Sequence, residues 1–487
     1  MKKQKRILAL LLMMTMAVWS LTGCGKDTQS GSETNTGDET ANTGSETNTG
    51  NETADPGKVT TITVWTGMTG NKEFMDEKVN EWNQTVGKEK NIKIDYQVKD
   101  NINDMLEVAF TSDQAPDMFP LGDIEKFVTS GRLAAIDDLP GGPELIAKYD
   151  GKLANYKHSY KGKTYILPNG ATTYGLVYNV DMFKAAGIVD ENGNAKPPET
   201  LEELREDAKL LTNPDKNEYG IVLPGKYGDW YSDVVMKPSS ATTGYLEYNP
   251  VTGLYDLGGV ATVMETIMGM KKDGSYLPGV EGLDNDPARA RFSEGGIGMY
   301  FSASYDYGVF TTQFPAKIDW AVAPYPTADK NTAHKGIVGY NRYIAINSSA
   351  VETKGAENLM EVYNWFYSDE MIIESYEKGY ALPTNMDLIK DVQLDENQKQ
   401  WKEYASLLDV SAGVPMQMPL DITGERTSAQ IWLEDIWSGK VPADQIREVC
   451  ENQAAVMNKG IEKYQELHPD FDPSAFIVPD WETQSKR

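Results

Sequence analysis

The feature that most constrains the fold is a regular alternation of strand and helix patterns that begins at Val59. The segments Val59–Trp65 and Ile92–Val98 are rich in β-branched residues and alternate in polarity, which predicts strands. Asn71–Gly87 and Ile102–Phe110 repeat apolar residues at helical spacing, and Asp117–Leu121 is a short apolar strand. Strand, helix, strand, helix, strand predicts an α/β fold that opens with a parallel, doubly wound sheet.

The same alternation continues along the rest of the chain. Thr200 and Glu203 form a capping-box pattern that predicts a helix start. Further strands are expected at Thr164–Leu167, Gly175–Asn179, Gly220–Leu223, Gly296–Phe301, Trp320–Ala323 and Tyr343–Ile346. Further helices are expected at Gly258–Lys272, Gly424–Trp437 and Ala443–Leu467. The region from Val59 onward is too long for one typical core, so we expect two domains.

Charge and cysteine content exclude several classes of function. The chain carries 73 acidic and 46 basic residues, a formal net charge of −27, which excludes nucleic acid as a partner because phosphate binding needs a basic face. It also disfavours polyanionic solutes and weakly favours neutral or cationic ones. After Cys24 the only cysteine is Cys450, which lies on the apolar stripe of the last long helix and is expected to be a buried, inert thiol.

No pattern of a metal site, a cofactor site or a catalytic site is present. The three histidines lie far apart in the sequence and no HExxH or CxxC spacing occurs, so no zinc site is expected. No GxSxG, Walker A or GxGxxG motif stands in a strand–turn–helix context. We therefore expect no catalytic residue and no cofactor.

The first residues have the parts of a secretory leader. Four basic residues precede the apolar run Ile7–Val18, and Leu21-Thr22-Gly23-Cys24 follows. That tetrapeptide resembles the bacterial lipobox, which implies a signal peptide over 1–23 and a diacylglycerol on the sulfur of Cys24. The alternative is an uncleaved membrane anchor, although a run of about 12 apolar residues is short for spanning a bilayer.

A low-complexity segment separates the leader from the folded body. Gly31–Gly37 recurs unchanged at Gly44–Gly50, and the stretch offers no large side chain to bury. Such a segment cannot offset its ordering entropy, so 24–58 is interpreted as a lipidated cysteine followed by a flexible tether.

Beyond these patterns, the body resembles the family-1 extracellular solute-binding proteins, the group that includes maltose-binding protein. The matching stretches, in family order, are Ile62–Gly67, Ala115–Phe119, Gly131–Leu139, Tyr160–Pro168, Leu176–Asn179, Phe292–Met299, Phe366–Ser368 and Ala381–Thr384. The resemblance implies a two-lobed, type II-like periplasmic-binding-protein fold, with the ligand cleft between α/β lobes joined by crossover hinge strands. The chain would cross near Asn169, near Tyr340–Tyr343 and near Asn385.

This resemblance also suggests domain boundaries. The first lobe would comprise 59–168 and return at 343–386, and the second would comprise 169–342 and the C-terminal helices at 387–487. Cleft closure around the ligand is the expected hinge motion.

Candidate ligand-binding residues combine strand-end positions with the family pattern. Trp65 ends the first strand, where doubly wound folds place ligands, and Thr66 and Gly67 follow it. By resemblance, an acidic residue in the loop after the third strand accepts sugar hydroxyls, which here would be Asp123. The other candidates implied by the resemblance are Thr172, Thr173, Trp230, Tyr231, Ser302, Tyr305, Tyr340 and Arg342. Asp117 is expected to stabilise the end of its strand instead.

The function that this resemblance implies is solute capture for an ABC importer. The protein would be a monomer, anchored by lipid to the outer face of the cytoplasmic membrane, and would deliver solute to the permease subunits.

The 10 Trp and 26 Tyr suit a neutral oligosaccharide, whose apolar faces stack on rings. Maltodextrin itself is in doubt, since Thr172 stands where the maltose-binding pattern has an acid. A peptide, a polyamine or a polyol phosphate remains an alternative solute, and a surface glycoside hydrolase is a more distant alternative.

Overall fold

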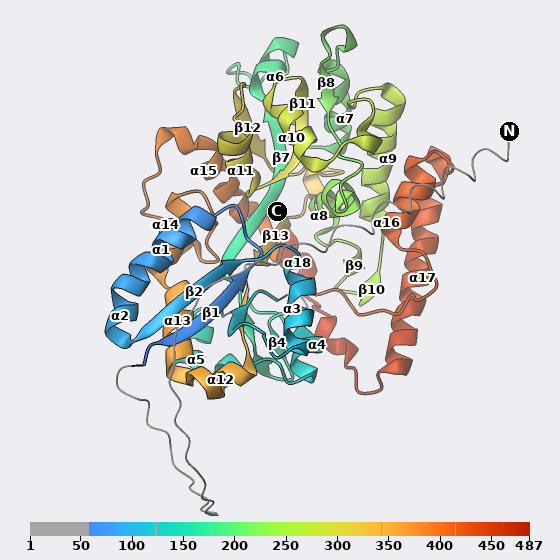
Figure 1. Ribbon diagram of the computed structural model, residues 1–487. Helices are drawn as coiled ribbons and strands as arrows, with labels where there is room; N and C mark the ends of the chain where they lie inside the picture. The colour runs from blue at the N-terminus through green and yellow to red at the C-terminus, as the bar shows by residue number, and fades with distance from the viewer. Residues whose placement is uncertain (1–57, 122–123, 151, 342, 414) are drawn as a thin grey trace, which may run out of the picture. The chain divides into compact units, whose positions relative to one another are not determined.

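The computed structural model describes residues 58–487 except 122–123, 151, 342 and 414 (Figure 1). The predicted leader and tether, the candidate lipidation site Cys24, and the candidate ligand residues Asp123 and Arg342 lie outside the described residues. Two sheets organise the described part of the chain, and each is covered by helices.

The first sheet has five strands in the order β2-β1-β3-β14-β6. Its strands are β1 (Thr60–Thr66), β2 (Ile92–Val98), β3 (Met118–Phe119), β6 (Ile166–Leu167) and β14 (Ile344–Ile346). β1 pairs in parallel with β2 and with β3, which confirms the predicted parallel opening, whereas β14 is antiparallel to β3 and to β6. We call this sheet and the helices packed on it the first lobe.

The helices that accompany the first sheet bury one apolar face each. In α1 the buried residues Met75, Val79 and Trp82 follow the 3–4 spacing that the sequence predicted. The helices are α1 (Lys72–Gln84), α2 (Val86–Lys90), α3 (Ile102–Thr111), α4 (Ile124–Thr129), α5 (Gly142–Ala147), α12 (Ser348–Lys354), α13 (Ala356–Phe366) and α14 (Asp369–Glu377). A small hairpin of β4 (Ser159–Tyr160) and β5 (Lys163–Thr164) completes this part.

The second sheet has six strands in the order β15-β13-β7-β11-β8, with β12 also paired to β7. Its strands are β7 (Gly170–Asn179), β8 (Tyr219–Ile221), β11 (Ile297–Ala303), β12 (Trp320–Ala323), β13 (Gly336–Asn341) and β15 (Ser411–Gly413). The start of β7 pairs with β13, and its end pairs with β11 and β12. We call this sheet and its helices the second lobe.

The helices of the second lobe occur both among its strands and after the last of them. The helices are α6 (Val180–Ala186), α7 (Leu201–Leu210), α8 (Lys237–Thr243), α9 (Gly258–Asp273), α10 (Asn285–Ser293), α11 (Asp306–Gly308), α15 (Lys399–Ser406), α16 (Ser428–Ile431), α17 (Ile446–Leu467) and α18 (Trp481–Ser485). A second hairpin pairs β9 (Tyr248–Asn249) with β10 (Leu254–Tyr255). The predicted capping box of Thr200 and Glu203 is present at the start of α7.

Two expected elements differ from the structure. The helix expected over Gly424–Trp437 begins only at Ser428, because the Thr427 side chain caps the backbone N–H of Gln430 and Gly424 has a left-handed φ of 89°. The strand expected at Thr164–Leu167 is divided, with its first half in the β4–β5 hairpin and its second half in the first sheet.

Two of the connections between the lobes are very short, and a third, longer one leads from α14 to α15 past Asn385. Residues 168–169 lead from β6 directly into β7, and residues 342–343 lead from β13 directly into β14. Figure 1 shows β7 as the long strand that leaves the first lobe and runs into the second. The backbone N–H of Asn169 donates to the carbonyl of Asn341 at 3.1 Å, so the two crossover segments are hydrogen-bonded to each other.

A buried tyrosine holds both crossover segments on the first-lobe side. The Tyr367 hydroxyl accepts from the backbone N–H of Ile344 at 3.2 Å and donates to the carbonyl of Leu167 at 2.6 Å. Its ring stacks on Tyr363 with centroids 4.6 Å apart. Because one hydroxyl bonds to the residues that flank both crossings, it couples the strand that leaves the first lobe to the strand that returns.

We predict that Tyr367→Phe destabilises the fold by about 1–3 kcal/mol, the cost of leaving buried backbone groups without their partner. Chemical denaturation of the purified protein measures this loss. Tyr376→Phe is the control, since the Tyr376 hydroxyl makes no hydrogen bond among the described residues and its ring is also buried. Equal stability of Tyr367→Phe and the wild type would contradict the role of this hydroxyl.

Candidate functional site

A cavity of about 460 Å³ lies where the two sheets meet. Both lobes and both crossover segments contribute to its walls, and we call it the interlobe cavity. Its lining residues are Val64, Trp65, Thr66, Gly67, Met68, Asn71, Met75, Tyr96, Ile102, Pro120, Leu121, Asn169, Thr172, Tyr305, Asn341, Tyr343, Ile344, Phe366, Met371, Ser375 and Ala381.

The first-lobe wall is built at the carboxyl end of β1. Trp65, Thr66 and Gly67 follow one another there, at the edge of a parallel sheet where ligands of doubly wound folds bind. The ammonium of Lys99 lies 4.7 Å from the centre of the Trp65 ring, which holds the indole in place. A Cβ at Gly67 would approach Ile102 to 3.1 Å, so the glycine allows the turn to pack closely on α3.

The crossover strands supply polar groups to the same cavity. Thr172 on β7 accepts a hydrogen bond of 2.8 Å from the Asn341 side-chain amide on β13. The Asn169 side chain donates to the carbonyl of Phe366 at 2.9 Å. These bonds tie the cavity floor to the strands that connect the lobes.

Tyr305 forms the second-lobe wall. It follows β11, and its side chain is 45% exposed, the most open large ring near the cavity. The next residue, Asp306, is buried and accepts from the Ser302 hydroxyl at 2.7 Å and pairs with Arg289 at 2.6 Å. The turn that presents Tyr305 is therefore anchored by a buried carboxylate while its own ring stays accessible.

The described residues that line the interlobe cavity are uncharged. None of its described lining residues is Asp, Glu, Lys, Arg or His. The side-chain oxygens of Asn71 and Asn341 are buried and make no hydrogen bond within the described part of the chain. A buried acceptor without a partner costs free energy, so these amides suit a ligand that donates hydrogen bonds.

Two other candidates, Thr173 and Ser302, are buried beside this cavity without lining it. Successive side chains of a strand point to opposite faces, so Thr172 faces the cavity and Thr173 turns into the second-lobe core. The Thr173 hydroxyl donates to the carbonyl of Tyr404 at 2.8 Å. Ser302 lies 2.6 Å from the Tyr404 hydroxyl, in addition to its bond to Asp306. Both hydroxyls are used inside the protein.

The structure places the candidates Trp230 and Tyr231 in the second-lobe core, and neither lines the interlobe cavity. Trp230 is 1% exposed and packs against Trp432 and Trp437 at centroid distances of 5.6 and 4.9 Å. The Tyr231 hydroxyl donates to Glu247 at 2.6 Å, and burial raises the pKa of both groups. Their loop position in the sequence concealed an aromatic core formed with residues about 200 positions later.

Tyr340 lies on the other face of β13 from Asn341, as the strand pleat requires, and it lines a different cavity. Asp123 and Arg342 lie outside the described residues. The interlobe cavity thus brings together Trp65, Thr66, Gly67, Thr172 and Tyr305 of the predicted set.

Sequence reasoning missed several residues of the cavity. Asn71 precedes α1 and looked like an ordinary helix start, although its side chain makes no cap hydrogen bond. Tyr96 looked like one residue of an alternating strand, and Asn341 was overlooked between Tyr340 and Arg342. The absence of a capping bond at Asn71 is visible only in three dimensions.

Residues outside the cavity have the structural roles expected of them. Asp117 accepts from the backbone N–H of Thr63 at 2.8 Å, which confirms its role at the strand end, and burial raises its pKa. Cys450 is buried, as predicted, and burial raises the pKa of its thiol to about 12.

Within the described ranges no cluster of three or more His, Cys, Asp or Glu could hold a metal ion, and no helix is long and apolar enough to cross a membrane.

Comparison with known proteins agrees with this geometry. The family model of the bacterial extracellular solute-binding proteins matches residues 66–373. The maltotriose-binding protein of Pyrococcus abyssi is 32% identical over 135 residues, which cover 27% of each chain.

Solved structures show the same two-lobed fold. RafE from Streptococcus pneumoniae has a TM-score of 0.61 at 15% identity, covering 84% of this chain and 100% of that one. The maltose/maltodextrin-binding domain MalE of Bdellovibrio bacteriovorus, bound to maltotriose, has a TM-score of 0.58 at 17% identity, covering 81% and 100%.

Proposed function

The chain belongs to the bacterial extracellular solute-binding proteins, and from this premise we propose that it binds a neutral oligosaccharide in the interlobe cavity. The observation that carries the proposal is the composition of the described lining, which combines aromatic rings with uncharged amides and hydroxyls and has no charged side chain. A neutral sugar offers apolar C–H faces and many hydroxyl donors, and such a wall complements both.

We propose that different groups of the sugar contact different described residues of the wall. Trp65 and Tyr305 would stack on sugar faces from the first and second lobes, respectively. The oxygens of Asn71 and Asn341 would accept hydroxyl hydrogens, and Thr66 and Thr172 would add hydroxyl contacts. A polyamine or a phosphate would instead need fixed opposite charges, which the described lining does not provide.

The energetic requirement is modest. Each stacked ring should contribute on the order of 1 kcal/mol beyond area burial, by analogy with aromatic pairs. Each hydrogen bond to a previously unpaired amide should add about 0.5–1.5 kcal/mol net. Together with burial of sugar C–H groups, these terms can reach micromolar affinity, about 8 kcal/mol.

The comparisons support a sugar as the solute class. RafE is known in complex with raffinose, MalE was solved with maltotriose, and the Pyrococcus relative is named for maltotriose. We infer that this chain takes a solute of the same class, whose sugar units and linkage are set by its own lining residues.

The proposed role continues beyond binding. After closure of the lobes, the loaded monomer would present its sugar to the permease subunits of an ABC importer, and no catalytic step is involved. Residues 1–23 would direct export, and lipid on Cys24 would hold the tethered body at the outer face of the cytoplasmic membrane.

We predict that Tyr305→Ala weakens oligosaccharide binding by at least about 1 kcal/mol, roughly fivefold, because it removes an exposed stacking ring. Isothermal titration with the preferred sugar measures the change. Trp230→Phe is the contrasting variant: its ring contacts only the second-lobe core, so affinity should stay at the wild-type value. Tyr165→Ala is the matched control, because Tyr165 is also not fully buried but does not line the cavity. Its removal tests whether losing a tyrosine ring outside the cavity changes affinity. Unchanged affinity in Tyr305→Ala would overturn this placement of the site.

A second prediction concerns the anchor. Cells that express the full chain and grow with a labelled fatty acid should incorporate the label into the protein, and Cys24→Ser should abolish incorporation and release the protein from the membrane fraction. Cys450→Ser is the matched control, since its buried thiol should not accept lipid. Membrane retention of Cys24→Ser would favour the uncleaved anchor instead.

A further inference from the structure

A second cavity, of about 410 Å³, lies on the opposite face of β13 from the interlobe cavity. Tyr340 and Asn341 are successive residues of that strand, and the pleat directs Tyr340 to the second cavity and Asn341 to the first. We call the second cavity the basic pocket. Its lining residues are Lys152, Leu153, Ala154, Asn155, Lys157, His158, Tyr340, Ala412, Gly413, Pro415, Met416, Ala475, Phe476, Val478, Trp481 and Gln484.

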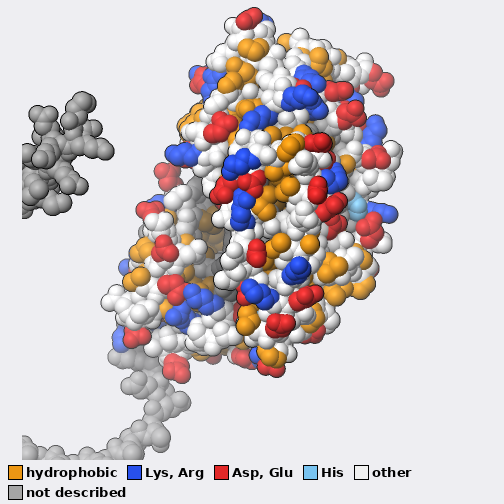
Figure 2. Space-filling view, turned by 90° about the vertical axis from the view of Figure 1, so that its right-hand side faces the viewer, with side chains coloured by type: hydrophobic (Ala, Val, Ile, Leu, Met, Phe, Trp, Pro, Cys, Tyr) orange, Lys and Arg blue, Asp and Glu red, His pale blue; other side chains and the backbone are white. Residues whose placement is uncertain are grey.

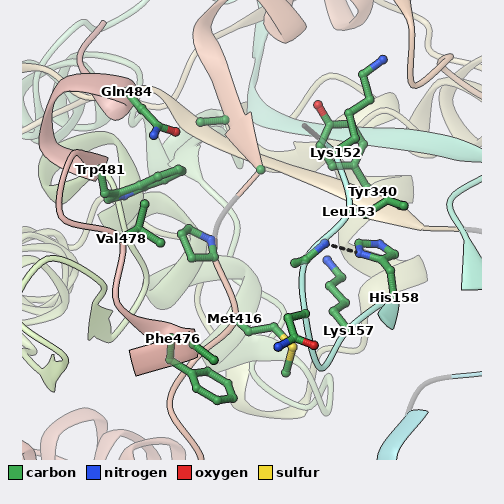
Figure 3. A pocket seen from close by; sticks show the side chains of 16 residues that line it. Lys152, Leu153, Lys157, His158, Tyr340, Met416, Phe476, Val478, Trp481 and Gln484 are labelled. Carbon is green, nitrogen blue, oxygen red and sulfur yellow. Dashed lines mark hydrogen bonds between the residues drawn. The ribbon is translucent and has the colours of Figure 1, made fainter. Parts of the chain in front are cut away.

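His158 gives this pocket a buried donor that has no acceptor. The backbone N–H of Ala154 donates to Nδ1 of His158 at 2.9 Å (Figure 3). Burial, together with the charge of Lys157, lowers the pKa of His158 to about 3, so the ring is neutral near pH 7. A neutral imidazole whose Nδ1 accepts carries its proton on Nε2. That Nε2–H is buried, in a side chain only 1% exposed, and has no partner among the described residues.

Lys157 adds a positive charge that is also unpaired. Its ammonium makes no hydrogen bond or ion pair within the described part of the chain, and burial lowers its pKa. Lys152 stands at another edge of the pocket, where the negative charge of Asp387 acts on it. No described lining residue is Asp or Glu, although the chain as a whole has 73 acidic residues against 46 basic ones. The wall near His158 therefore offers donors without an acceptor of opposite charge.

The wall that faces these donors is apolar. In Figure 3, Trp481, Val478 and Phe476 lie across the pocket from Lys157 and His158. The Trp481 indole N–H is already used, because it donates to the carbonyl of Gly244 at 2.9 Å, so the ring presents only its apolar surface. A ligand that fits both walls has a negatively charged acceptor at one end and an apolar body at the other.

We propose that the basic pocket binds a small organic carboxylate with an apolar body, whose carboxylate accepts hydrogen bonds from Nζ of Lys157 and Nε2 of His158. This site is separate from the interlobe cavity, with which it shares no described lining residue. Pairing a half-buried ammonium and a buried N–H with one carboxylate satisfies two donors at once.

The test uses phenylacetate as the probe and phenylacetamide as its neutral counterpart, titrated into the purified protein near pH 7. Phenylacetate should bind at least about tenfold more tightly than phenylacetamide, because charge-assisted hydrogen bonds are lost in the amide. Lys157→Gln should weaken phenylacetate binding at least about tenfold while the melting temperature without ligand stays equal or rises, since a half-buried charge without an ion-pair partner in the described part of the chain is removed. Lys161 is a nearby lysine outside the pocket lining, so the control variant Lys161→Gln should bind phenylacetate as tightly as the wild type.

NMR can observe the Nε2–H group of His158 directly. The chain has three histidines, so imidazole nitrogen-15 spectra are simple to assign with His158→Gln as a reference. Phenylacetate should shift the Nε2–H signal of His158, and phenylacetamide should not. Absence of phenylacetate binding, equal binding of the amide, or displacement of phenylacetate by inorganic phosphate at equal concentration would each overturn the proposal. Loss of phenylacetate binding in Tyr305→Ala would place the probe in the interlobe cavity and would also overturn it.

Discussion

The pair of strands β7 and β13 is the feature on which the rest of this structure depends. They are hydrogen-bonded to each other, each continues directly into the first sheet, and both crossings are tied by the Tyr367 hydroxyl. Because side chains alternate along a strand, this pair separates its residues by face: Thr172 and Asn341 reach the interlobe cavity, while Tyr340 reaches the basic pocket. The chain crosses a third time between α14 and α15, where the carbonyl of Leu382 accepts from the backbone N–H of Ala171 at 2.8 Å. Rotation of one lobe against the other would act on these three connections, so the strands that form the cavity floor are part of the hinge.

The electrostatics of the molecule are local. A net charge of −27 favours neutral or cationic partners, and the uncharged described lining of the interlobe cavity agrees with a neutral one. The basic pocket differs, because lysines line it although the chain as a whole is acidic. On the face shown in Figure 2, Lys and Arg side chains lie among Asp and Glu side chains without forming one large patch of either charge. The net charge of the chain therefore does not determine what either cavity binds.

Strand and helix patterns were read correctly where local periodicity decides them. Strand β2 begins and ends where its alternation predicted, and α17 buries Ile446, Cys450, Met457 and Ile461 on the expected stripe. The residues of the site were harder to predict from the sequence than the helices and strands. Trp230 and Tyr305 both follow turns in the second lobe and have similar local sequence signals. Only the tertiary partners separate them: Trp432 and Trp437 enclose Trp230, whereas the buried Asp306 carboxylate holds Tyr305 in an open turn. The exact lobe boundaries remain predictions from the family pattern.

A thermal-shift screen of the purified protein against neutral oligosaccharides, amino acids, short peptides and polyamines would identify the class of solute that the interlobe cavity binds. A ligand at about 100 times its dissociation constant adds roughly 2.7 kcal/mol to stability, which moves the melting midpoint measurably. We expect a shift with one series of neutral oligosaccharides and none with polyamines. A shift with polyamines or peptides and none with any sugar would keep the fold and contradict the neutral-sugar cavity.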